Sequence, residues 1–446
     1  MSRSGESKSS VSIFSRLFGK KPGHLGQTQD APGAAASSLP LPPEFREDIR
    51  TARKSVKRFL RFGDASALDA ASSAWERVLN HPAFPGTEAR FQLAASNHAG
   101  RVLLRRYRAQ GRVQDLDRAL ELWRQAVKLT PPDSPKLPGY LNNLGTGLSG
   151  RYERAGRLED LEEAIGVYRQ AVELTPADSP DMPGYLNNLG NGLRNRYERA
   201  GRLEDLEEAI GVYRQAVKLV PADSPDMPGY LNNLGTGLSG RYERAGRPED
   251  LEEAIGVYRR AVELTPADSS VMPGYLNNLG TGLNVRYERV GRPEDLEEAI
   301  GVYRRAVELT PAGSPDMPGY LNNLGTGLSG RYERAGRPED LEEAIGVYRR
   351  AVELTPAGSP GMAGYLNNLG TGLSGQYERA GRPEDLEEAI GVYRRAVKLT
   401  PADSPDLRIY LNNLDARLRN RSAHMAKPAD RPSSSAFHDT EEPMIE

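Results

Sequence analysis

One six-residue motif returns through this chain at a fixed spacing of 45 residues. The motif is Tyr140-Leu-Asn-Asn-Leu-Gly145, and further copies start at Tyr185, Tyr230, Tyr275, Tyr320 and Tyr365. A seventh copy starts at Tyr410 and ends in Asp415 instead of glycine. A constant period of this length indicates a repeat array in which each unit packs on its neighbours. We therefore predict one elongated repeat domain instead of several separate globular domains.

Each unit is expected to form two helices, which we name helix A and helix B. In the second regular unit, Ser179-Pro-Asp181 is predicted to cap and open helix A, which then runs to about Ala200. Gly201 is expected to end it as a C-cap glycine. Later units place a proline such as Pro248 at the start of helix B, and Thr265-Pro266 should stop that helix.

The spacing of apolar residues predicts which helix faces are buried. Helix B carries a complete stripe at Leu161, Ala164, Ile165, Tyr168, Ala171 and Val172, and helix A carries one at Leu141, Leu144, Leu148 and Tyr152. Neither helix can bury its stripe alone, so the pairs must stack. Gly145 and Gly147 each cost about 1 kcal/mol in a helix interior. We expect close approach of neighbouring helices to compensate, with Ala164 and Ala171 as the small facing residues.

Composition divides the chain into four expected segments. Residues 1–41 and 422–446 are poor in apolar residues and are predicted to be disordered. Residues 42–89 match the later units only in part and are expected to form a degenerate N-terminal capping hairpin, because an end unit exposes one face to water. Residues 90–421 form the array, closed by a capping helix. Within the first segment, residues 11–21 are either a short basic amphipathic helix that touches a membrane or a partner, or part of an unstructured tail.

Charge and cysteine content exclude several classes of protein. The chain has 59 basic and 61 acidic residues, so no global field attracts nucleic acid or an anionic membrane. Cysteine is absent, which removes disulfides, thiolate metal sites and a cysteine nucleophile. No apolar run has the length of a membrane span, and the N-terminus lacks the apolar core of a signal peptide. A cytoplasmic protein is expected.

No arrangement of residues predicts catalysis, a cofactor or a metal. The histidines all lie outside the regular units, at His24, His81, His98, His424 and His438. Gly145-Thr-Gly-Leu-Ser-Gly150 has the G-x-G-x-x-G pattern, but its glycines lie in the middle of a helix, whereas a dinucleotide site needs a strand before them. The acidic cluster from Glu159 to Glu163 is explained by its place at the start of helix B. We predict a non-enzymatic protein.

Rows of arginine could suggest a surface for phosphate groups. The residues are Arg151, Arg154, Arg157 and Arg169 and their equivalents in other units. Glutamates such as Glu153 and Glu162 alternate with them, so the rows are expected to pair internally or across units, and nucleic-acid binding is not expected.

The polar face of helix A is the candidate binding surface. Asn142, Thr146, Ser149 and Glu153 follow one another at helical spacing opposite the apolar stripe. Side-chain amides can give one donor and one acceptor to an extended peptide. Substitutions between units gather at this face, above all at Asn191, Arg194 and Asn195. The predicted peptide-binding residues are Asn142, Thr146, Ser149, Asn187, Asn191, Arg194, Asn195, Asn232, Thr236, Ser239, Asn277, Thr281, Asn284, Asn322, Thr326 and Asn367.

A structural role competes with this prediction. Asn142 and Asn143 are equally compatible with solvation or with hydrogen bonds to the backbone of the adjacent unit. The sequence leaves both explanations open, because substitutions at the same face also arise where a position is free to drift.

The small, aromatic and proline positions resemble those of a tetratricopeptide repeat, namely Asn143-Leu-Gly145, Ala164, Tyr168, Ala171 and Pro176. The family period is 34 residues, so this unit is longer. The longer form, with YLNNLG, RYERAG and DLEEAI in succession, resembles repeat arrays that bacterial and fungal proteins carry beside CHAT caspase-like protease modules or nucleotide-binding signalling switches.

The resemblance implies an all-α, right-handed superhelical solenoid of stacked antiparallel helix hairpins, about eight in number plus a closing helix, whose A helices line a concave groove. The expected function is a scaffold that binds a protein or an extended peptide. The alternative is a stand-alone sensor or regulatory arm of a CHAT-type or nucleotide-switch system that acts in trans. Membrane contact is expected only through residues 11–21, and the oligomeric state is not predicted.

Overall fold

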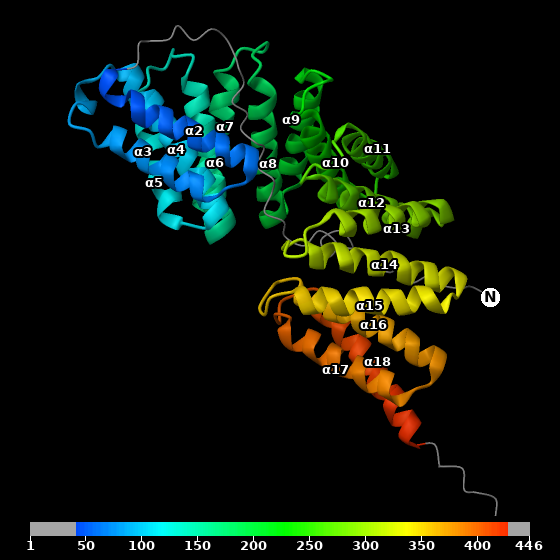
Figure 1. Ribbon diagram of the computed structural model, residues 1–446. Coiled ribbons are helices and arrows are strands. Elements are labelled where there is room, and N and C mark those ends of the chain that lie inside the picture. Colours follow the sequence, from blue (N-terminus) through cyan, green and yellow to red (C-terminus); the bar gives the residue numbers. More distant parts are fainter. Residues whose placement is uncertain (1–41, 427–446) are drawn as a thin grey trace, which may run out of the picture. The chain divides into compact units, whose positions relative to one another are not determined.

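The computed structural model describes residues 42–426 of the chain. Residues 1–41 and 427–446 lie outside the described residues, and with them lie the segment 11–21 and most of the expected C-terminal tail. The described residues form two compact units (Figure 1). The first unit ends at Gly291 and the second begins at Arg292.

Every regular element between residues 42 and 426 is a helix, which confirms the prediction of an all-α repeat array. The first unit contains η1 (Pro43–Phe45), α2 (Arg46–Phe62), α3 (Ser66–Leu79), η2 (Phe84–Gly86), α4 (Ala89–Gln110), α5 (Val113–Leu129), α6 (Leu137–Ala155), α7 (Leu158–Glu173), α8 (Met182–Ala200), α9 (Leu203–Leu219), α10 (Met227–Ala245), α11 (Pro248–Leu264) and α12 (Met272–Val290). The second contains α13 (Pro293–Leu309), α14 (Met317–Ala335), α15 (Pro338–Leu354), α16 (Met362–Ala380), α17 (Pro383–Leu399) and α18 (Leu407–Ala426).

The A helices are the even-numbered helices from α4 to α18, and the B helices are the odd-numbered ones from α5 to α17. Within each unit, every helix packs on the helix before it and the helix after it in the chain. Leu141 near the start of α6 packs with Ala171 near the end of α7, while Arg151 near the end of α6 pairs with Asp160 near the start of α7. Paired helices are therefore antiparallel.

The ends of the helices follow the predicted glycine and proline signals. Gly201 follows the end of α8 with a φ of 68°, and its N–H donates to the carbonyl oxygen of Tyr197 at 2.7 Å. A positive φ suits glycine because it has no Cβ. Pro248 is the first residue of α11, and that helix ends at Leu264, just before Thr265-Pro266. These predicted boundaries are confirmed.

The predicted start of helix A is wrong by two residues. Helix α8 begins at Met182, and its proline in the first turn is Pro183. The Oγ atom of Ser179 accepts a hydrogen bond from the Asp181 N–H at 3.3 Å, and its carbonyl oxygen accepts one from the Met182 N–H at 3.1 Å. Ser179-Pro-Asp181 therefore forms a turn that leads into the helix, because the serine hydroxyl bonds locally in that turn instead of capping a helix.

The glycines of helix A make room for aromatic rings. A Cβ atom added to Gly145 would lie 2.6 Å from Cε1 of Tyr168 on α7, and one added to Gly147 would lie 2.8 Å from Cδ2 of Leu120 on α5. The expected partners Ala164 and Ala171 are fully buried, but Ala171 packs on leucines at the start of α6. The expectation that alanines face the glycines was therefore wrong, since tyrosine and leucine side chains fill that space.

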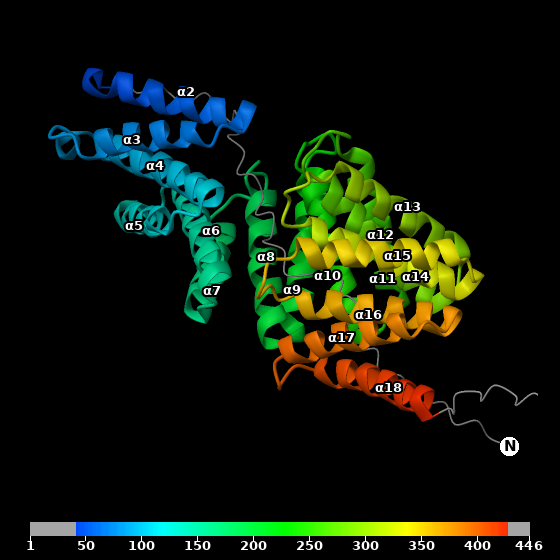
Figure 2. The same ribbon diagram turned by 60° about the horizontal axis from the view of Figure 1, so that its bottom comes forward.

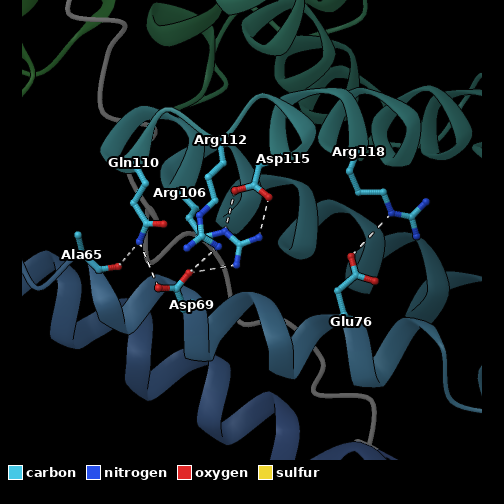
Figure 3. A network of polar contacts seen from close by, with 8 residues as sticks. All are labelled: Ala65, Asp69, Glu76, Arg106, Gln110, Arg112, Asp115 and Arg118. Atoms are coloured by element: carbon cyan, nitrogen blue, oxygen red, sulfur yellow. Dashed lines mark hydrogen bonds and ion pairs between the residues drawn. The ribbon is translucent and has the colours of Figure 1, made fainter.

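A polar network joins the first helix pair to the rest of the first unit (Figure 3). The Arg106 guanidinium of α4 donates two hydrogen bonds of 2.6 Å to the Asp115 carboxylate of α5. It also donates to Asp69 of α3 at 3.3 Å. Beside it, Gln110 Nε2 donates to the Ala65 carbonyl oxygen at 2.9 Å. Three successive helices are thus linked through one arginine.

The same polar arrangement recurs in the regular 45-residue repeats. Arg241 of α10 donates to both carboxylate oxygens of Asp250 on α11, at 2.8 and 2.6 Å, and to Glu207 of the preceding B helix at 2.6 Å. Bidentate arginine–carboxylate pairs are among the stronger polar contacts in proteins. Arg196 and Arg331 make the same contacts, to Glu162 and Glu297 of the preceding B helices. Each of these arginines ties its own repeat to the preceding one.

Candidate peptide-binding face

In the first regular repeat, formed by α6 and α7, the predicted binding face is buried. Asn142, Thr146 and Ser149 of α6 are 5%, 1% and 2% exposed. Helix A packs on its own B helix, on the preceding B helix and on the next A helix. The side opposite the apolar stripe is therefore covered over the first turns of the helix.

The asparagines of the motif form a ladder that runs from unit to unit. Asn188 Nδ2 of α8 donates to Asn142 Oδ1 of α6 at 2.9 Å, and Asn233 Nδ2 of α10 donates to Asn187 Oδ1 of α8 at 2.8 Å. Equivalent bonds join Asn143 to Asn97, Asn278 to Asn232, Asn368 to Asn322 and Asn413 to Asn367. In each of these pairs, the second asparagine of one motif binds the first asparagine of the preceding motif, through side chains instead of the backbone.

Hydroxyl groups extend this internal network. The Thr146 hydroxyl donates to the Asn142 carbonyl oxygen at 2.9 Å. The Tyr168 hydroxyl lies 3.4 Å from the hydroxyls of both Thr146 and Ser149. Burial raises the pKa of Tyr168 to about 12, so the phenol keeps its proton at physiological pH. These polar groups serve the packing of helices A and B.

Helix α8 differs from the other A helices at the same places. The Tyr213 hydroxyl of α9 donates to Asn191 Oδ1 at 2.7 Å, which is shorter than the equivalent contacts in the first regular unit. Arg194 replaces a buried serine, forms an ion pair with Glu198 one turn along the helix, and keeps 20% of its side chain exposed. Asn195 is half-buried. Two of the three predicted local candidates therefore reach solvent.

A line of glutamates occupies the accessible end of the same face. Glu153 of α6 is exposed, and the Glu198 side chain of α8 is 56% exposed. Glu243 of α10 is half-buried, and its Oε1 atom is buried without a hydrogen-bond partner among the described residues. Burial, together with the nearby Glu198 carboxylate, raises the pKa of Glu243 to about 8. Arg194 is the cation placed among these carboxylates.

Sequence reasoning noticed Glu153 but did not include this line among the binding residues. The signal was present, because the glutamate of every RYERAG segment lies eleven residues after the first asparagine of its motif and so shares its helix face. The asparagines were favoured over these glutamates because the asparagines were expected to be accessible to a ligand.

The remaining candidate residues divide into two groups. Those that are buried are Asn187, Asn191, Ser239, Asn277, Thr281, Asn284, Asn322 and Asn367. Those that are half-buried are Asn232, Thr236 and Thr326. The ladder thus brings the motif asparagines together from helix to helix, and the accessible polar groups lie nearer the C-terminal ends of the A helices.

Three of the four arginines named in the first regular repeat are paired within the protein. Arg151 donates to both oxygens of Asp160, at 2.9 and 2.6 Å, and Arg169 donates to Glu208 of the next B helix at 2.6 Å. Arg157 lies 3.8 Å from Asp160. Their charges are balanced locally, as expected from the alternating signs in the sequence.

Metal binding and membrane crossing can be compared with the residues that the structure describes. Between residues 42 and 426, no group of three or more histidine, cysteine, aspartate or glutamate residues is arranged to hold a metal ion. In the same part of the chain, no helix combines the length and the apolar character needed to cross a membrane.

The family model described as tetratricopeptide repeat matches residues 139–181, 184–226 and 362–406. Solved structures with a similar fold include YrrB, described as a TPR protein with an unusual peptide-binding site. It is 21% identical, with 51% of this chain and 93% of that chain covered and a TM-score of 0.34. BtubC from P. vanneervenii is 20% identical over 63% of this chain and 99% of that chain, with a TM-score of 0.37.

A third similar structure is a protein of Thermus thermophilus that is described as a thermophilic TPR protein. It is 22% identical over 52% of this chain and 98% of that chain, with a TM-score of 0.36. No curated protein sequence gives a significant match. The three matched segments are thus similar to a tetratricopeptide repeat.

Proposed function

We propose that this chain is a non-catalytic scaffold that binds an extended peptide, or an extended segment of a protein, along the accessible end of its A-helix polar face. Tetratricopeptide repeats are suited to binding proteins and peptides, and the all-α array supplies such a scaffold. The binding surface that we propose is centred on Arg194 and includes Glu153, Glu198 and Glu243.

The arrangement around Arg194 is the observation that carries this proposal. An arginine that is partly accessible, already oriented by its ion pair with Glu198, can donate to a backbone carbonyl or a carboxylate of a ligand. The Glu153 carboxylate on α6 can accept from backbone N–H groups or from cationic side chains. The Glu243 carboxyl on α10 keeps its proton near neutral pH, and its carbonyl oxygen can accept from a backbone N–H group. An extended peptide that crosses α6, α8 and α10 would meet acceptors, then donors, then acceptors.

Repetition supplies a second reason for this surface. Each A helix from α6 to α16 presents one glutamate at the same position, so a peptide that crosses several of these helices meets one weak contact per repeat. Several weak contacts on one ligand raise the overall affinity without a deep pocket. The buried asparagine ladder holds neighbouring A helices together, which fixes the spacing of these contacts before a ligand arrives.

The ends of the array are proposed to act as caps. Helices α2 and α3, in the segment 42–89, cover one end, and α18 covers the other, where Asn413 continues the ladder to Asn367 at 2.9 Å. The alternative role, as a regulatory arm of a CHAT-type or nucleotide-switch system, stays a prediction of the family resemblance. A gene for such an effector beside this one would support it.

The test of the binding surface is a variant that restores the common helix sequence. Asn191→Thr, Arg194→Ser and Asn195→Gly together convert α8 into the sequence of α10, which already folds in the same array. Peptides selected from a random 12-residue phage library on the wild type should bind the triple variant at least about tenfold more weakly, because each lost charge-assisted hydrogen bond contributes about 1.5 kcal/mol or more.

The matched control is Arg350→Ser, which removes an exposed arginine from α15 and changes the net charge by the same amount. Peptide affinity, measured by fluorescence polarisation, should not change in this control. Equal affinity of the triple variant and the wild type would show that peptides bind elsewhere or not at all.

A further inference from the structure

Helix α2 differs from the other helices of the first compact unit in the basic residues on its exposed side. It is the outermost helix of that unit, and it packs on α3 (Figure 2). Phe45, Ile49 and Ala52 lie on the packed side and are buried. The opposite side of the helix faces away from α3.

A continuous stripe of cations follows that outer side. Arg50, Lys54, Lys57 and Arg61 are spaced by four, three and four residues, which places them on one face of an α-helix. All four are exposed, and none of them forms an ion pair with another residue between 42 and 426. Their charges are therefore available to an external partner, in contrast to the paired arginines of the regular units.

Apolar side chains end the stripe. Leu60 is 59% exposed and Phe62 is 69% exposed, whereas most large apolar side chains of the first unit are buried. The Arg61 guanidinium carbon lies 5.1 Å from the centre of the Phe62 ring. Leu60 lies eleven residues after Ile49, on the packed side of the helix, so Phe62 is the exposed apolar side chain beside the cations. An exposed phenylalanine beside a cationic stripe is suited to an interface that is charged at its surface and apolar just beneath.

The sequence concentrates positive charge at this end of the chain. Residues 1–62 contain 12 basic and 5 acidic residues, while the remaining residues contain 47 basic and 56 acidic residues. The near-neutral total hides this asymmetry. A field of this kind, local to one end, orients a protein on a negatively charged surface.

We propose that the outer face of α2, formed by Arg50, Lys54, Lys57 and Arg61 with Phe62 at its C-terminal end, docks the protein on the surface of an anionic phospholipid bilayer. Lipid headgroups would pair with the four cations, and Phe62, which lies beside Arg61, would enter the boundary between headgroups and acyl chains. A nucleic acid offers phosphates to the cations but gives no apolar layer for Phe62, so the lipid surface fits the whole face better.

Sedimentation with lipid vesicles tests the proposal on the full chain. Wild-type protein should sediment with vesicles of phosphatidylcholine and phosphatidylserine in a 70:30 ratio, and it should not do so with phosphatidylcholine alone. Changing Arg50, Lys54, Lys57 and Arg61 together to Gln should weaken binding about a hundredfold or more, because each basic residue near an anionic surface contributes about a fivefold gain in affinity.

Two control variants locate the effect. Changing Arg305, Arg350, Arg394 and Arg395 together to Gln removes four exposed arginines from the second unit and alters the net charge equally. This variant should bind vesicles like the wild type. Changing Arg16, Lys20 and Lys21 to Gln tests the N-terminal segment, and loss of binding there with no loss in the α2 variant would overturn the proposal.

A second measurement does not depend on the folding of the quadruple variant. Because the chain has no cysteine, Phe62→Cys can be labelled alone with an environment-sensitive fluorophore, and Leu399→Cys, at another exposed apolar position, serves as its control. Anionic vesicles should shift the emission of the label at position 62 to the blue and leave the label at 399 unchanged. No shift at 62, or an equal shift caused by duplex DNA or RNA, would overturn the lipid assignment.

Discussion

The two halves of each A helix have the same neighbours but different roles. The first half, with the motif Tyr-Leu-Asn-Asn-Leu-Gly, is unchanged from α6 to α16, is largely buried, and bonds to adjacent helices. The second half differs between units and reaches solvent at residues such as Arg194 and Glu198. A repeat array can vary a ligand contact at low cost in stability only where the side chain does not also hold two units together.

The largest expected effect tests the packing half. Gly190→Val should lower the free energy of unfolding by about 3 kcal/mol, because a Cβ atom there would lie 2.5 Å from Cε1 of the Tyr213 ring. Gly211→Ala is the matched control, since a Cβ at that helical position meets nothing within 4 Å. It should stabilise the protein by about 0.5–1 kcal/mol. Urea denaturation followed by circular dichroism measures both, and a loss of stability in the control would contradict this account.

A medium effect compares two tyrosines at equivalent positions. Tyr213→Phe should destabilise the protein by about 1 kcal/mol, because it removes the 2.7 Å hydrogen bond to Asn191. Tyr168→Phe should cost only a small fraction of that free energy, since its two hydroxyl contacts are 3.4 Å long. The difference between the two midpoints in urea sharpens the comparison between α8 and α6. Equal losses would show that the shorter bond has no special weight.

A smaller effect depends on pH and concerns the accessible half. The pKa of Glu243 is raised from 4.5 to about 8, so the folded chain keeps a proton that the unfolded chain releases. Stability should therefore fall as pH rises from about 5 to 8. Glu198 and Tyr197 on α8 and Tyr258 on α11 are the titratable groups that interact with this carboxyl.

Glu243→Gln removes the carboxyl group that keeps this proton in the folded chain. Its melting temperature should equal that of the wild type near pH 5 and exceed it at pH 9. A constant difference across this range would mean that the Glu243 carboxyl titrates normally.

The smallest expected effect on stability is that of the triple change in α8. Asn191→Thr, Arg194→Ser and Asn195→Gly should alter the free energy of unfolding by less than about 1 kcal/mol, because the new sequence is that of α10 and its environment differs little. The loss of the Tyr213–Asn191 hydrogen bond accounts for most of this change. A large destabilisation in differential scanning fluorimetry would show that Arg194 contributes to the packing of the helices.

Local signals in the sequence predicted the helices well. Glycine after the last turn of helix A and proline at the start of helix B act on the backbone itself, so Gly201 and Pro248 mark real boundaries. Ser179-Pro-Asp181 misled the prediction because serine before proline suits a turn as well as a helix cap. The glycine and proline signals do not depend on contacts with the rest of the fold.

Contacts between units were harder to predict. Helical periodicity separates the two faces of a single helix, but it does not show that four other helices contact α6 and that Asn142 is buried on its polar side. The asparagine ladder therefore could not be derived from spacing alone. The exposed cations of α2 were missed for a different reason, since the net charge of the chain is only −2 and conceals a basic end.

The central claim is that the motif asparagines bind one another across units, and a double-mutant cycle on Asn142 and Asn188 tests it most directly. The two side chains share one 2.9 Å hydrogen bond, so Asn142→Ala and Asn188→Ala should each destabilise the protein by about 1–2 kcal/mol. The double variant should lose about 1 kcal/mol less than the sum of the single losses, measured by urea denaturation. Additive losses, with a coupling energy near zero, would contradict the ladder.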